Sequence, residues 1–235
     1  MKNKILGVLF LTALVIILLV VLFPRAISLN QIQSMKQEII LSSPNATSNT
    51  SIEEALFKRR SIREYKDEPL ELKEISQILW ASQGITEPER GGRTAPSAGA
   101  LYPLEVYVVV RKAEGLEPGV YHYVPKEHKL EKILEGDLSA QLARAALGQV
   151  SVKEAAVNMV ISAVYGRTTK KYGERGVRYA HLEAGHAAQN VYLQAESLDL
   201  GTVTVGAFSD EEVKNLLHLP EEETPLYIMP IGKPR

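Results

Sequence analysis

Two groups of cations, one of which includes a hydroxyl, lie at opposite ends of residues 51–235. The groups consist of Arg59, Arg60, Ser61 and Arg63 on one side and of Lys233 and Arg235 on the other. A phosphate monoester carries close to two negative charges and three strong acceptor oxygens, so guanidinium, ammonium and hydroxyl groups are suitable donors for it. We therefore expect one phosphate site that is closed by both ends of a domain. The alternative is two solvated runs of charge.

Two further segments are candidates for binding or chemistry. Residues 91–103 form a loop of small residues that includes Pro96, Ser97, Ala98 and Gly99. Such a loop lets the backbone approach a flat or large ligand closely. Lys171 and Tyr172 lie in the basic stretch 167–178, and the residues alone favour an exposed loop there.

Composition excludes several kinds of site. The chain has 235 residues, 45% of them hydrophobic, which is enough for one domain with a sizeable core and an appendage. It has no Cys, which excludes disulfides, thiolate catalysis, iron–sulfur clusters and Cys-ligated zinc. The net charge of −1 gives no indication of nucleic-acid binding. His181 and His186 are five residues apart, a spacing that does not align them on one helix face, so no metal site is predicted.

The N-terminus predicts a membrane anchor. Ile5 to Phe23 is an almost unbroken apolar run without charge, long enough at about 1.5 Å per residue to span a hydrocarbon core of about 30 Å. Lys2 and Lys4 precede this run, so the positive-inside rule places the domain outside the cytoplasm. Residues 1–27 are therefore interpreted as an uncleaved anchor. The rival interpretation is a cleaved signal peptide and a secreted protein.

Residues 28–50 are interpreted as a flexible stalk rich in Ser, Thr and Asn. The stretch 42–50 has too little apolar content to pack, and it contains acceptor sequons at Asn45 and Asn49. The folded domain is expected to begin at Ser51, where Ser51 and Glu54 have the spacing of a capping box.

Helices and strands alternate without regular βαβ spacing in residues 51–235, which favours the α+β class. We expect helices after Ser51, over 71–83 and over 177–198, the last of which is rich in small residues suited to close packing. Trp80 is expected in the core. Predicted strands are 106–111, a hairpin of 120–124 with 129–134, a buried strand 156–165, and strands 201–208 and 226–231. A second capping box begins at Ser209.

Taken in order, these motifs resemble the FMN-dependent nitroreductase superfamily, most closely its SagB-type dehydrogenase branch. The matching segments are 59–63, 96–103, 171–173, 179–186, 205–208 and 232–235, so the resemblance covers about residues 52–235. It implies a nitroreductase-like fold, with a central mixed or antiparallel sheet flanked by helices. It also implies a homodimer with FMN at the interface.

The resemblance assigns a role to each candidate residue. FMN phosphate and ribityl contacts would come from Arg59, Arg60, Ser61, Arg63, Lys233 and Arg235. Pro96, Ser97, Ala98 and Gly99 would lie along the isoalloxazine ring, and the backbone of Val205, Gly206 and Ala207 would face flavin N5. Lys171 and Tyr172 match a pair that handles protons in azoline-oxidising members.

Three functions follow as hypotheses. The first is an FMN oxidoreductase that passes hydride from a reductant such as NAD(P)H to a small molecule. The second is a SagB-type azoline dehydrogenase acting on a ribosomal peptide, and the third is a noncatalytic flavin-binding module.

Overall fold

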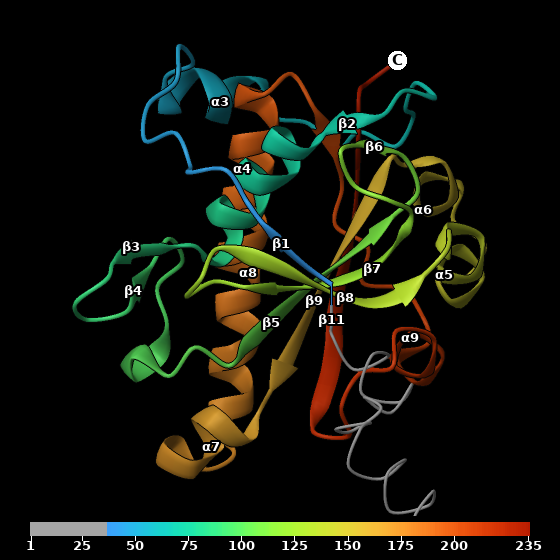
Figure 1. The fold of residues 1–235 in the computed structure, drawn as a ribbon. Helices are drawn as coiled ribbons and strands as arrows, with labels where there is room; N and C mark the ends of the chain where they lie inside the picture. The colour runs from blue at the N-terminus through green and yellow to red at the C-terminus, as the bar shows by residue number, and fades with distance from the viewer. Residues whose placement is uncertain (1–36) are drawn as a thin grey trace, which may run out of the picture. The chain divides into compact units, whose positions relative to one another are not determined.

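The computed structural model describes residues 37–235, which form one compact unit from Gln37 to Arg235. A seven-stranded sheet with the order β1-β8-β7-β5-β9-β11-β10 runs through it, and every pair of neighbouring strands is antiparallel (Figure 1). The strands are β1 (Glu38–Ile40), β5 (Leu104–Val110), β7 (Gly119–Val124), β8 (Lys129–Glu135), β9 (Val157–Val164), β10 (Gly201–Thr202) and β11 (Glu223–Gly232). The α+β class and the antiparallel sheet are therefore confirmed.

Two small ribbons accompany the sheet. One pairs β2 (Leu70–Glu71) with β6 (Ala113–Glu114) in parallel, and the other pairs β3 (Ile85–Glu87) with β4 (Gly92–Arg93) antiparallel.

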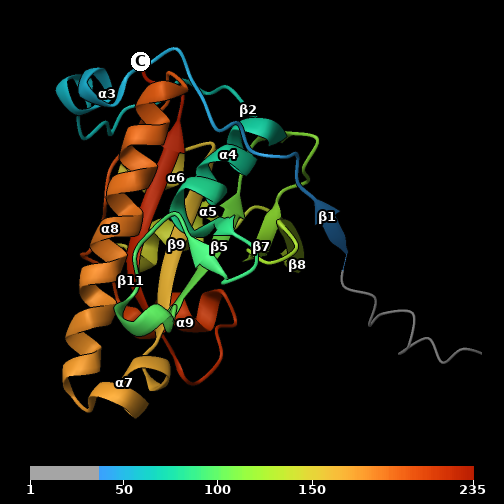
Figure 2. The ribbon, with the colours of Figure 1, turned by 90° about the vertical axis from the view of Figure 1, so that its left-hand side faces the viewer.

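Helices cover both faces of the sheet (Figures 1 and 2). They are α3 (Ile52–Lys58), α4 (Leu72–Gln83), α5 (Ser139–Ala145), α6 (Val150–Glu154), α7 (Gly166–Tyr172), α8 (Arg175–Ser197), α9 (Asp210–Leu216) and the 3₁₀ turn Ala98–Ala100. Val106 and Val108 of β5 pack with α4 and α8, whereas Tyr107 and Val109 pack with α5, α6 and α9. Because side chains alternate along a strand, β5 fills both halves of the core.

Local sequence signals explain the helices near the candidate site. Ser51 accepts a hydrogen bond from Glu54 N at 3.1 Å and so caps α3, and Ser209 caps α9 in the same way. Ala184 and Ala187 are among the small residues of α8 that lie buried against the sheet, as their type predicts. Trp80 is only half-buried, so its placement in the core was wrong.

The interpretation of residues 28–50 as a stalk is wrong for residues 37–50. Strand β1 extends the sheet by pairing with β8, and Leu41 is buried in the core with 5% of its surface exposed. Asn45 N donates to Gln77 Oε1 at 2.8 Å, which fastens the following segment to α4. Backbone pairing and one apolar side chain therefore order a segment whose composition is polar. The compact unit begins at Gln37, not at Ser51.

The strand predicted over 201–208 is shorter in the structure, where it is β10. It ends at Thr202, and an isolated bridge from Val205 to Ile228 follows. No helix within residues 37–235 is long and apolar enough to cross a membrane. The predicted anchor, residues 1–27, lies outside the described residues.

Candidate functional site

Residues 62–66, which follow the first cationic group, lie beside the C-terminal residues 233–234 and beside Thr202. Ile62 N donates to Thr202 O at 2.9 Å, and Lys66 N donates to Lys233 O at 2.9 Å. Tyr65 forms a bridge with Pro234 between these contacts. Backbone hydrogen bonds therefore bring the first cationic group beside the C-terminus.

A group of hydroxyls and one guanidinium surrounds Tyr192 of α8 at this junction. The Tyr192 hydroxyl lies 3.2 Å from Ser61 Oγ and accepts a hydrogen bond from Thr204 N at 2.8 Å. The Arg59 guanidinium lies 5.1 Å from the centre of the Tyr192 ring. Burial would raise the pKa of Tyr192, but the hydrogen bonds with Ser61 and Thr204 and the charge of Arg59 lower it below its ordinary value. We name Arg59, Ser61, Tyr192 and Thr204 the Tyr192 cluster.

Thr202 adds a buried hydroxyl close to this junction. Only 2% of its surface is exposed, and its Oγ1 has no hydrogen-bond partner within residues 37–235. A buried hydroxyl without a partner is costly unless something else satisfies it. The donor types here fit a phosphate group and its polar chain.

The remaining predicted cations point to other partners. Arg60 Nη1 donates to the carbonyls that end α3, at 2.9 Å from Phe57 O and 2.8 Å from Arg59 O. Lys233 Nζ lies 3.5 Å from a Glu68 oxygen.

Arg235 donates to Tyr65 O at 2.9 Å and lies 3.7 Å from a Glu154 oxygen. Arg63 and Arg235 line a separate cleft with Gln149 and Ser151. The backbone segments that carry the cations therefore lie close together, as predicted. The side chains of Arg60, Arg63, Lys233 and Arg235, however, do not gather at one site.

The loop of small residues meets the Lys171–Tyr172 pair. Gly99 has a φ of +64°, and a Cβ built on it would lie 2.6 Å from the Tyr172 hydroxyl and 2.9 Å from Lys171 Nζ. The Tyr172 ring packs edge-on against Tyr179, with centroids 5.1 Å apart. The segment with this pair is helix α7 and not a loop, although Lys171 is exposed as expected. Only Gly at position 99 allows so close an approach.

The end of this loop is also held by side chains. Tyr102 has a φ of +43°, its N–H donates to Ser97 Oγ at 2.9 Å, and its ring lies 4.5 Å from the Arg93 guanidinium. We name residues 97–102 the Gly99 loop. Pro96 and Gly99 are exposed, and Ser97 and Ala98 are half-buried.

Glu183 of α8 lies behind this loop, and the residue patterns alone gave it no role. Only 2% of its surface is exposed, and neither carboxyl oxygen makes a hydrogen bond within the described residues. Burial raises the pKa of Glu183 to about 7, while Ser97, Arg93 and Gln83 lie near enough to oppose this only in part. In the sequence, the indication of a role for Glu183 was its position within residues 179–186, one of the segments that resemble the nitroreductase superfamily.

Residues 205–207 present accessible backbone. Val205 is buried and exchanges hydrogen bonds with Ile228 at 2.8 and 2.9 Å, whereas Gly206 and Ala207 are exposed. A Cβ on Gly206 would meet only the edge of Tyr227, at 3.8 Å. There is room here for a ligand to approach the chain.

The Tyr192 cluster and the Gly99 loop lie toward opposite ends of α8. Figures 1 and 2 show α3 beside one end of α8 and α7 beside the other. Glu183, which lies behind the Gly99 loop, and Tyr192 are separated by about 14 Å along the axis, at 1.5 Å per residue.

The Nitroreductase family model matches residues 56–233. A protein named as a nitroreductase in Methanocaldococcus jannaschii is 52% identical over 182 residues, which cover 77% of this chain and 90% of that protein. The microcin B17-processing protein McbC of Escherichia coli is 28% identical over 170 residues, which cover 69% of this chain and 62% of McbC.

Solved structures show the same fold. A protein from Ralstonia eutropha described as a nitroreductase has a TM-score of 0.75 and 32% identity, over 85% of this chain and 90% of that chain. A chain of the Escherichia coli microcin synthetase McbBCD complex, solved with truncated pro-MccB17 bound, has a TM-score of 0.66 and 25% identity, over 91% of this chain and 84% of that chain.

Proposed function

Because the chain belongs to the nitroreductase family, we propose that it is an FMN-dependent oxidoreductase that passes hydride from a reductant such as NAD(P)H to a small-molecule acceptor. Bound FMN would supply the hydride chemistry, and the protein would supply binding, orientation and proton handling. The observation that carries this proposal is the Tyr192 cluster, which gathers a cation and hydroxyls where residues 59–66 meet Thr202 and the C-terminal residues.

Arg59, Ser61 and Thr204 would hold the FMN phosphate and ribityl chain, joined by the nearby Thr202 hydroxyl. Arg63, Lys233 and Arg235 would join them by turning away from their present partners, since all three side chains are at least partly exposed. Arg60 is held by the carbonyls of α3, and its contribution would be to position Arg59. The accessible backbone at 205–207 would lie beside the ring.

A homodimer would complete this site. As the resemblance to the family implies, FMN would lie at the interface, and each flavin would take its phosphate contacts from one copy and its Gly99 loop from the other. Exposed apolar side chains on α3, including Phe57 at 80% exposed, favour coverage by a partner. The small residues of α8 would contribute to the core of each copy.

A second candidate function is azoline oxidation on a peptide, as in SagB-type dehydrogenases. The specific observation that favours it is the packing of Lys171 and Tyr172 against Gly99, where one of them would remove a substrate proton. The similarity to McbC supports this candidate. Its test is loss of peptide oxidation in Lys171→Ala or Tyr172→Phe with FMN still bound.

Residues 1–27 would tether the enzyme to a membrane with the domain outside the cytoplasm, as the apolar run Ile5–Phe23 suggests. Fractionation of cells that express the full chain, with and without those residues, tests this part of the proposal. A domain outside the cytoplasm would have limited access to NAD(P)H, so a membrane quinol or partner reductase would then be the electron donor.

The first experiment is an absorbance spectrum of the purified full chain, followed by anaerobic titration with NADH, NADPH and a chemical reductant. Flavin bands at about 370 and 450 nm that bleach with a nicotinamide support a reductase. Bands that bleach only with the chemical reductant point to another donor. Bound FMN without turnover by any donor or acceptor supports the noncatalytic module, and no FMN uptake contradicts the proposal.

FMN affinity tests the Tyr192 cluster directly. Ser61→Ala and Arg59→Ala should each weaken FMN binding about tenfold or more, because each removes a donor to a charged oxygen. Arg175→Ala is the matched control, because Arg175 is exposed at the far end of α8.

A further inference from the structure

Arg167, in the first turn of α7, connects three elements through one guanidinium. Its Nη1 donates to the carbonyl of Tyr102, the last residue of the Gly99 loop, at 3.0 Å. Its Nη2 makes an ion pair with Glu105 Oε1 on β5. The planar fork of Arg suits two acceptors at fixed positions, whereas an ammonium does not.

The second carboxyl oxygen of Glu105 also has a partner, which holds the side chain in place. His122 Nε2 lies 2.8 Å from Glu105 Oε2, and only 15% of the Glu105 side chain is exposed. Burial acts to raise the pKa of Glu105, but His122 and Arg167 lower it below its ordinary value, so it remains a carboxylate near neutral pH. Arg167 therefore contacts an acceptor that the sheet has already oriented, unlike the mobile partner of a typical surface ion pair.

The Gly99 loop needs such a restraint. Gly99, Ala100 and Tyr102 have φ values of +64°, +53° and +43°, and the last two are not glycines. Side chains other than Gly pay a conformational cost in this left-handed region, so the surrounding contacts must enforce it. The Tyr102 carbonyl is the point where Arg167 supplies one of those contacts.

We propose that Arg167, oriented by Glu105, is a positioning residue that fixes the Gly99 loop and α7 in one arrangement and so keeps Lys171 and Tyr172 against Gly99. This rests on the proposed role of Lys171 and Tyr172 in proton handling. Arg167 itself does not contact the reacting atoms. Its effect passes through the loop on one side and through the helix that bears the pair on the other.

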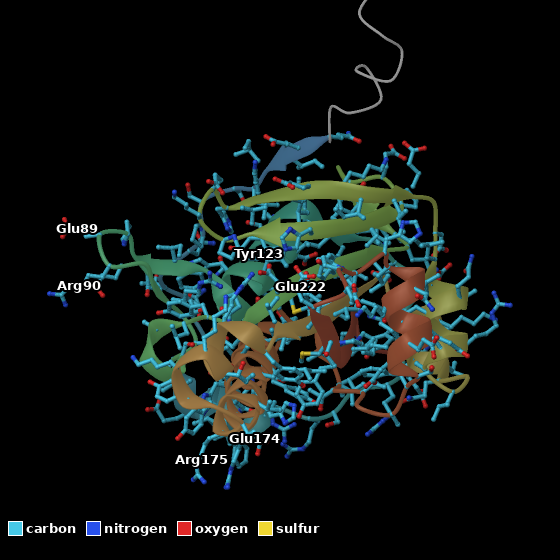
Figure 3. All side chains as sticks on the ribbon, turned by 90° about the horizontal axis from the view of Figure 1, so that it is seen from below. Glu89, Arg90, Tyr123, Glu174, Arg175 and Glu222 are labelled. Carbon is cyan, nitrogen blue, oxygen red and sulfur yellow. The ribbon has the colours of Figure 1, made fainter. Side chains whose placement is uncertain are left out.

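Hydrogen–deuterium exchange on the full chain without flavin tests the restraint apart from activity. Arg167→Ala should accelerate exchange in both 97–102 and 166–173 about tenfold, because a partly exposed hydrogen bond to a charged group is lost. Arg167→Lys should give an intermediate value, because its single ammonium cannot make both contacts. Arg175→Ala is the control. Figure 3 shows Arg175 projecting away from the body at the start of α8, and it makes no ion pair within residues 37–235.

Turnover and FMN affinity are then measured on the same variants. Arg167→Ala should lower kcat about tenfold with the FMN Kd and the KM for the reductant unchanged, and Arg167→Lys should restore part of kcat. Exchange in Arg167→Ala that equals that in Arg175→Ala would overturn the proposal. Faster exchange in both segments with unchanged kcat would support the restraint and count against the role of Lys171 and Tyr172 instead.

Discussion

Glu183 allows a quantitative test of the packing behind the Gly99 loop. It is buried on α8, neither of its oxygens has a hydrogen-bond partner in the described part of the chain, and burial raises its pKa from 4.5 to about 7. Each pKa unit corresponds to 1.36 kcal/mol, so ionising this group in the folded state costs about 3 kcal/mol more than in the unfolded chain.

The direction in which pH changes the free energy of unfolding follows from the two pKa values of Glu183. The unfolded chain releases the Glu183 proton at about pH 4.5, whereas the folded chain holds it until about pH 7. The contribution of this proton to stability is therefore complete below the unfolded pKa. It is lost as pH rises through the folded pKa. Glu183→Gln removes the titration and nearly preserves the shape of the side chain.

The assay is urea unfolding of both proteins from pH 4 to pH 8.5. The stability of Glu183→Gln relative to the parent should increase by about 3 kcal/mol across this range, mostly between pH 5 and pH 7. Glu89→Gln, at an exposed loop tip (Figure 3), is the control and should show no such trend. A difference between Glu183→Gln and the parent that stays constant from pH 4 to pH 8.5 would refute the reasoning.

Three further predictions concern other parts of the chain. A chain that lacks residues 1–50 should have a free energy of unfolding at least about 2 kcal/mol lower than one that lacks only residues 1–36, because the buried Leu41 is then lost; urea unfolding of the two truncated chains checks this. Gly99→Ala should displace the Tyr172 hydroxyl and lower kcat severalfold with FMN still bound, since its Cβ would come within 2.6 Å; kcat and the FMN Kd are the measurements, and an unchanged kcat would contradict it. Tyr192→Phe should lower the free energy of unfolding by about 1 kcal/mol by removing the acceptor of Thr204 N, and a stability equal to that of the parent would count against this contact.

Sequence patterns predicted the parts of the fold that local chemistry determines. The hairpin of β7 and β8, the buried strand β9 and the small-residue helix α8 lie close to where periodicity placed them. Residues 37–50 did not follow from composition, because what orders them is distant. Strand β1 pairs with β8 about ninety residues further along the chain, and no local signal records that pairing.

In the candidate site too, local sequence predicted some features, whereas others depend on contacts between residues far apart in the chain. The cationic residues at 59–63 and 233–235 could be identified from the sequence, and their approach follows from the pairing of 61–66 with β10 and with residues 233–234. The pairing of Ser61 with Tyr192 and that of Glu105 with Arg167 join residues far apart in sequence, with nothing in their spacing to suggest contact. Likewise, the present partners of Arg60, Lys233 and Arg235 depend on side-chain contacts that only the folded chain defines.

The two ends of the site should fail differently when they are altered, because they are built differently. Backbone hydrogen bonds from Ile62 and Lys66 fix the end beside the Tyr192 cluster, so a side chain removed there would take away a proposed FMN contact and leave these hydrogen bonds intact. The Gly99 loop has backbone in a costly conformation and depends on the side chains of Ser97, Arg93 and Arg167. Substitutions at the first end should therefore change mainly FMN affinity. Substitutions at the second should change mainly kcat, because they would alter the position of the proposed catalytic pair, Lys171 and Tyr172, while the proposed phosphate contacts remain.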